Sequence, residues 1–183
     1  MKKLLLVLLL ITTVTYSQSN SDIKSYAVKY LTESIIQFKG QEVFPFELEF
    51  LNKSFEPKEL NLFYYSVEKT NNQGVLLCFI NRFWTKESPR IVNKYTFYNL
   101  NLKKFQQFLN KLINIENAWG KNEWDKNLSF KFDDLTIVIH KRKSKMNSKL
   151  TLYLREFDSE WSHHRIRKTK EQLKQLVIES RNK

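Results

Sequence analysis

The sequence predicts an α+β domain with a single antiparallel sheet of about six to seven strands and helices packed mainly on one face. Strand-like runs occur in two blocks, and short turns within each block favour antiparallel pairing. Segments with helical periodicity precede, separate and follow the blocks, which gives the order α-β4-α-β3-α. Only 3 glycines and 3 prolines occur in 183 residues, and this scarcity favours long regular elements.

The first block follows a predicted helix. Apolar residues recur at helical spacing from Ile23 to Phe38, and Gly40 provides the stop signal. Four strand-like segments come next: 43–50, 60–69, 75–83 and 92–98. The second and third of these form the clearest hairpin, across a turn that ends at Gly74. Because the segment after this turn is apolar on both faces, it should be a central strand covered on both sides.

The second block follows an amphipathic helix that Asn101 caps and that continues to Ile113. Three strand-like segments come after it: 128–132, 135–140 and 149–157. A closing helix is predicted to begin at Thr169, where Thr169 and Gln172 form a capping box. The two halves therefore share a strands-then-helix layout, although no repeat is visible at the level of residues.

The N-terminus has the pattern of a secretory signal peptide. Lys2 and Lys3 precede the apolar run Leu4–Ile11, and small residues follow up to Ser17. This run is much shorter than the roughly 20 residues that a membrane-spanning helix needs. We therefore expect a signal peptide at 1–17 and a single α+β domain at 18–183. The mature chain would be periplasmic or secreted, with no stable membrane insertion.

Cysteine usage and charge limit the chemistry of the mature chain. Cys78 is the only cysteine and lies in an apolar run, so it is expected to be a buried, unreactive thiol. The formal net charge is +12, and it remains strongly positive without Lys2 and Lys3. This excess either keeps an exported protein soluble or attracts an anionic polymer. Nucleic acid is a less favoured partner, because the most basic segment contains no aromatic residue for base stacking.

Two groups of side chains are candidate binding residues. Four cations occur within five residues of one loop: Lys141, Arg142, Lys143 and Lys145. If the strand 149–157 follows this loop, the loop and the basic segment 165–170 should lie at opposite ends of that strand, about 30 Å apart. Three tryptophans are expected near loops, where they would either anchor a partner or cap the core: Trp119, Trp124 and Trp161.

The histidines are weak candidates for catalysis: His140, His163 and His164. Adjacent histidines point apart on a helix or a strand, and no zinc-binding motif supports them, so no metal site is predicted. Hydrolysis of a phosphodiester would require His140 to converge with one of the pair, which the expected strand length opposes. No nucleotide-binding or hydrolase motif is present, and no cofactor is predicted.

Together, these features favour a non-enzymatic binding or accessory module of the cell envelope or the extracellular space. Its ligand would be an unknown protein or an anionic polymer. The alternative is a small secreted, nuclease-like hydrolase that acts on a polyanion through the histidines. The sequence leaves the oligomeric state and the identity of the ligand open.

Overall fold

A computed structural model gives the structure of the chain. The described residues are 23–36, 45–53, 58–70, 72–84, 91–118, 127–140 and 149–181. They belong to two compact units, residues 1–43 and 44–183. In the first unit, residues 23–31 are helical and continue into a π-helical turn, η1 (Thr32–Ile36). Buried Ile23, Ala27 and Leu31 lie four residues apart and so share one face of this helix.

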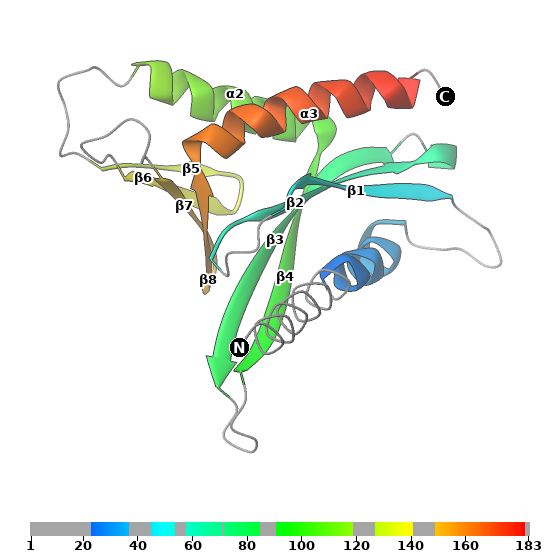
Figure 1. Cartoon of the computed structure of the whole chain (residues 1–183), viewed down its shortest axis with the longest axis horizontal. Coiled ribbons are helices and arrows are strands. Elements are labelled where there is room, and N and C mark those ends of the chain that lie inside the picture. Colours follow the sequence, from blue (N-terminus) through cyan, green and yellow to red (C-terminus); the bar gives the residue numbers. More distant parts are fainter. Residues whose placement is uncertain are drawn as a thin grey trace, which may run out of the picture. The chain divides into compact units, whose positions relative to one another are not determined.

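The second unit begins with a four-stranded antiparallel sheet in the order β1-β2-β3-β4 (Figure 1). Its strands are β1 (Phe46–Asn52), β2 (Asn61–Val67), β3 (Asn72–Trp84) and β4 (Ile91–Asn101), and a short 3-10 helix, η2 (Glu68–Thr70), lies between β2 and β3. Residues Val75 to Phe79 of β3 are fully buried, although consecutive side chains point to opposite faces. The prediction of a central strand covered on both sides is therefore confirmed.

A second four-stranded antiparallel sheet follows in the order β5-β6-β7-β8. Its strands are β5 (Leu128–Phe132), β6 (Leu135–His140), β7 (Lys149–Leu154) and β8 (Phe157–Ser162). Two-residue turns close the β5–β6 and β7–β8 hairpins, with Asp133 at a φ of 48° and Arg155 at 55°. This left-handed conformation favours glycine, so a chain with few glycines uses an aspartate and an arginine there instead.

The prediction of a single sheet of six to seven strands with helices on one face is wrong, because the chain forms two separate sheets of four strands each. The second block contains four strands instead of three. The chain turns at Arg155 and Glu156 and returns as β8, where a single longer strand was expected. Buried positions in β8 include Ser159 as well as Phe157 and Trp161. A serine among the inward residues weakens the alternating apolar signal of this strand.

One helix follows each sheet. Helix α2 (Leu102–Ala118) begins where it was predicted, and the Lys104 amide donates to Asn101 Oδ1 at 2.9 Å. Helix α3 (His163–Arg181) begins six residues before the predicted start. Thr169 lies inside it and is fully buried, and its hydroxyl donates to the Arg165 carbonyl at 2.8 Å. The predicted capping box at Thr169 is therefore wrong.

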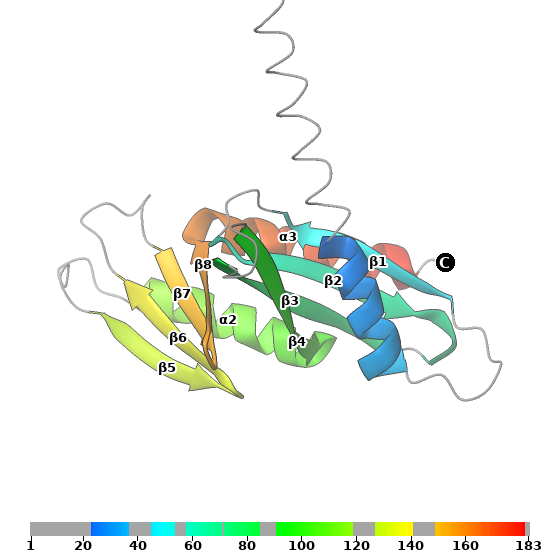
Figure 2. The ribbon, with the colours of Figure 1, turned by 90° about the horizontal axis from the view of Figure 1, so that it is seen from below.

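Helices α2 and α3 lie side by side in opposite directions (Figures 1 and 2), and Lys170 Nζ donates to Asn110 Oδ1 at 3.0 Å between them. Each helix contacts the last strand of its own sheet and the first strand of the other sheet. Helix α2 contacts β4, and its Phe108 ring lies 5.0 Å from Phe132 of β5. Helix α3 contacts β8 and β1. The unit thus consists of two ββββα halves that share one core, and they contact each other through the two helices and through β3 and β8.

Candidate anion-binding site

The end of the second sheet where α3 begins brings together several of the predicted site residues. The backbone of His140 at the end of β6 pairs with Lys149 at the start of β7, and Lys149 pairs with Ser162 at the end of β8. Adjacent strands are about 4.8 Å apart, so the backbones of His140 and Ser162 are about 10 Å apart. His163 follows directly as the first residue of α3.

All three histidines thus lie at one end of this sheet in their backbone positions. The expectation that strand length separates His140 from the His163–His164 pair is wrong, because β8 returns the chain to the end where β7 began. His164 is exposed on the first turn of α3. The side chains of His140 and His163 lie outside the described part of the structure.

The basic loop itself, with Lys141, Arg142, Lys143 and Lys145, also lies outside the described residues. The strand ends that it joins are described, and both are at the end of the sheet where α3 begins. Both ends of the loop are therefore within two strands of the first turn of α3. The expected separation of about 30 Å between two cationic segments does not hold for these attachment points.

Cations crowd the first two turns of α3, in the order Arg165, Arg167, Lys168 and Lys170, and the first turn contains no acidic residue. The helix macrodipole favours the opposite arrangement, because the N-terminal end of a helix is itself positive. Placing basic side chains there costs some helix stability and raises the local positive potential. An anion at this end would be stabilised by the side chains and by the helix dipole together.

An acidic residue of the first half neutralises one of these cations. Arg165 Nη1 lies 2.9 Å from Glu59 Oε2, and the Glu59 side chain is only 9% exposed. Nη1 has no aligned hydrogen-bond acceptor, so the contact is an electrostatic ion pair. A short parallel bridge holds Glu59 in place: the Leu60 amide donates to the Glu160 carbonyl at 2.8 Å, and the Glu160 amide donates to the Lys58 carbonyl. Arg165 therefore links the two halves.

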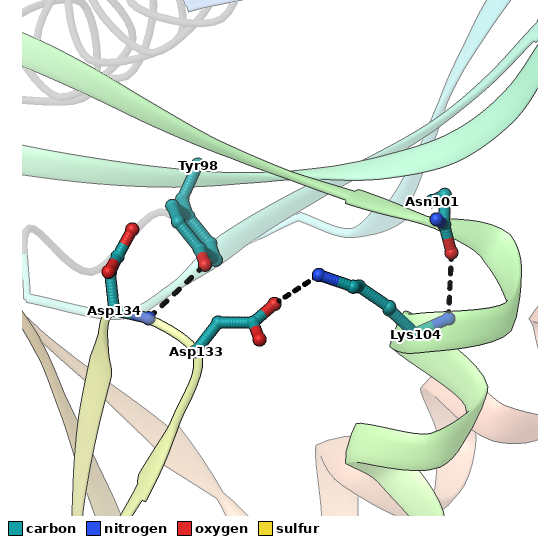
Figure 3. Close-up of polar contacts among 5 residues, drawn as sticks. All are labelled: Tyr98, Asn101, Lys104, Asp133 and Asp134. Atoms are coloured by element: carbon teal, nitrogen blue, oxygen red, sulfur yellow. Dashed lines mark hydrogen bonds and ion pairs between the residues drawn. The ribbon is translucent and has the colours of Figure 1, made fainter.

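The first half has an equivalent contact (Figure 3). Lys104 is the third residue of α2, as Arg165 is of α3, and its Nζ lies 2.8 Å from Asp133 Oδ2. Asp133 and Glu59 each lie two residues before the second strand of their own half. Each helix therefore begins with a cation that pairs with an acidic residue of the opposite half. The sequence showed no residue-level repeat, because these residue pairs are far apart in the chain and differ in type.

Tyr98 completes this junction from β4. Its hydroxyl oxygen accepts a hydrogen bond of 3.4 Å from the Asp134 amide (Figure 3). Burial raises the pKa of Tyr98, and the hydrogen bond to the Asp133 carboxylate raises the pKa of Lys104. Both groups therefore keep their protons at neutral pH. The two halves are therefore joined here by a hydrogen bond to a neutral phenol and by an ion pair to a protonated lysine.

The tryptophan candidates have different outcomes. Trp161 lies in β8 with 0% exposure, and its ring stacks on Phe108 with the centroids 6.4 Å apart. Trp161 thus belongs to the core, which was the alternative to a surface anchor. Trp119 and Trp124 lie outside the described residues, and their role stays a prediction.

Three further properties of the described part of the chain concern metal binding, thiol chemistry and membrane spanning. No group of three or more His, Cys, Asp or Glu side chains there could hold a metal ion. Cys78 is buried, and burial raises the pKa of its thiol far above the usual range. Among the described helices, none is both long and apolar enough to cross a membrane.

The pairing of Arg165 with Glu59 could not be predicted from local sequence patterns. Glu59 lies in the other half of the chain, more than 100 positions before Arg165 in the sequence. Glu156, in the turn before β8, pairs with the first half as well: its Oε1 lies 3.9 Å from Lys94 Nζ of β4. Comparison with protein-family models, curated protein sequences and solved structures found no significant match to this chain.

Proposed function

We propose that the protein is an exported, non-enzymatic binding domain whose partner is anionic and contacts the end of the second sheet where α3 begins. The observation that carries this proposal is the backbone pairing of His140 with Lys149 and of Lys149 with Ser162. This pairing supports one basic site, built from the loop 141–148 and the start of α3, instead of two distant patches.

The charge of these segments supports an anionic partner. Residues 140–149 and 163–170 contain nine lysines and arginines and neither aspartate nor glutamate. Glu59 of the first half pairs with Arg165. A solvated basic loop needs no such neighbour, whereas a binding site gains from combining its charge with that of a positive helix end.

Neutralising the loop tests the proposal. Replacing Lys141, Arg142, Lys143 and Lys145 with glutamine in the mature chain should lower the salt concentration that elutes the protein from immobilised heparin. Each contact to an anionic group releases about one counterion on binding. Because the variant makes fewer such contacts, log K should depend less steeply on log salt, and the magnitude of the slope should decrease by roughly 3.

The matched control removes the same charge elsewhere, at four exposed lysines: Lys24, Lys29, Lys58 and Lys131. The control should elute close to the wild-type protein. Equal elution of the loop variant and the control would contradict the proposed site, and a wild-type protein that heparin does not retain would contradict the proposed function.

A polyanion hydrolase remains the second candidate, because the backbones of His140 and His163 lie at one end of the sheet. The backbones of His140 and of Ser162, which directly precedes His163, are about 10 Å apart, so two imidazoles could reach one phosphodiester as general base and general acid. The mature protein would then cleave RNA or DNA, and either His140→Ala or His163→Ala would reduce the rate at least about 100-fold. No cleavage by the wild-type protein would exclude this candidate.

A further inference from the structure

The outer faces of α2 and α3 form one exposed polar surface. On α3 the exposed residues recur every three or four positions, among them Arg167, Lys168 and Lys174. On α2 the same spacing exposes Lys103, Gln107 and Asn114. The bond between Lys170 and Asn110 holds the helices together, and packed helices lie about 8–10 Å apart. A linear polymer can therefore contact both helices at once.

This surface is strongly basic. Helices α2 and α3 contain nine lysines and arginines and three acidic residues, so they carry +6 of the formal +12. Lys104 and Arg165 are paired with acids of the opposite halves, and both lie at helix starts. Among the described side chains of the outer faces, Glu171 is the only acidic one. Lys103, Lys168 and Lys174 are exposed on these faces, so an anionic partner could contact cations of both helices.

Amide side chains accompany the cations. Gln106, Gln107 and Asn114 of α2 are exposed, and Gln175 is exposed on α3. Amides both donate and accept hydrogen bonds, which suits hydroxyl groups, whereas lysine and arginine only donate and suit carboxylates, sulfates or phosphates. A polymer that carries both hydroxyls and anions would use both sets of side chains.

The outer faces lack stacking groups. Ile178 is the only large hydrophobic residue that is exposed within the described parts of these helices. Proteins that bind single-stranded nucleic acid stack bases on aromatic side chains, and the described part of this surface provides none.

From the combination of cations and amides without aromatics, we infer that the outer faces of α2 and α3 bind an extended acidic polysaccharide. This inference rests on the proposed function and extends its site from the start of α3 along both helices.

Two variants of the mature chain test this inference. The first replaces Lys103, Lys168 and Lys174 with glutamine. The second replaces Gln106, Gln107 and Asn114 with alanine, which favours helix formation and keeps the fold intact. The control replaces Lys24, Lys58 and Lys131 with glutamine at exposed sites outside the two helices. Melting temperatures close to the wild-type value should establish that every variant folds.

Binding is measured with heparin, which carries sulfates, carboxylates and hydroxyls, with inorganic polyphosphate, which has no hydroxyls along its chain, and with duplex DNA. The lysine variant should bind heparin and polyphosphate about tenfold more weakly at low salt, with a shallower salt slope, because it removes three charge contacts. The amide variant should bind heparin several-fold more weakly and polyphosphate as tightly as the wild-type protein, since only heparin offers hydroxyls to the amides.

The outcomes separate this inference from the proposed function. If the wild-type protein binds none of the three polymers, both fail. If it binds heparin but the lysine variant behaves like the control, only the helix surface is excluded. If the amide variant leaves heparin binding unchanged and duplex DNA binds more tightly than heparin, the surface recognises a phosphate backbone, and the assignment to a polysaccharide is overturned.

Discussion

Cys78 illustrates at the scale of one residue what burial does to a titratable group. Its thiol lies in the fully buried part of β3, and burial raises its pKa above the value of about 8.5 that a free cysteine has. The folded state therefore keeps the proton at a pH where the unfolded chain releases it. Because the folded pKa is the higher one, the associated stability is complete below about pH 8 and is lost as the pH rises.

The consequence is measurable as alkaline destabilisation. Between pH 8 and pH 10 the wild-type protein should lose about 2 kcal/mol more of its free energy of unfolding than Cys78→Ala. Urea unfolding at pH 7, 8, 9 and 10 gives both curves, and the cavity left by alanine costs the same at each pH. Parallel curves for the two proteins would show that the thiol ionises equally in both states.

Gly74 shows a limit of prediction at the same scale. The sequence placed it at the end of a turn, whereas it lies within β3, between Tyr65 of β2 and Asn101 of β4. A Cβ atom there would come within 2.7 Å of the Leu100 carbonyl oxygen and within 2.5 Å of the Tyr65 hydroxyl. The reason for this glycine is a close approach between strands, which local sequence does not reveal.

At the scale of elements, both helices were predicted, but only α2 was predicted with the correct start. Phe105 and Phe108 are buried at the start of α2, and this spacing produces a clear helical pattern. The corresponding positions of α3, four and seven residues into the helix, are Ile166 and Thr169, both buried. A buried threonine is tolerated there because its hydroxyl donates to the Arg165 carbonyl. In the sequence the same threonine resembles a helix cap, so the predicted start was too late.

The missed strand β8 changed the candidate site more than any other error. Without it, the chain after β7 would continue away from the basic loop, and the cations would form two patches. With it, Ser162 pairs with Lys149, and α3 begins beside the strand ends that flank the loop. The positions of the basic residues and the antiparallel pairing of the strands could be read from the sequence. The pairing register of β6, β7 and β8 was needed to show which basic segments lie at the same end of the sheet.

At the scale of the whole molecule, hairpins were predictable because their turns are local, but the separation into two sheets was not. That separation depends on contacts between the halves, such as β3 with β8 and Glu59 with Arg165. These contacts join residues that are far apart in the chain and leave no periodic signal. The same contacts lead to an expectation about folding, because each helix contacts both sheets.

The second unit should therefore unfold as one cooperative body. Leu173 of α3 is buried in the shared core, and α3 contacts β8 of its own sheet and β1 of the other. Leu173→Ala should lower the free energy of global opening by about 2–4 kcal/mol, measured by hydrogen exchange at the slowest amides of β3 and of β6. Both sheets should lose protection by the same amount, since the two helices cover the core that both sheets share.

Ile178→Ala, at a position 60% exposed on the same helix, is the matched control. It should change the free energy of opening of neither sheet by more than about 0.5 kcal/mol. Loss of protection confined to β6 would mean that the halves unfold independently and that the helix contacts do not couple them.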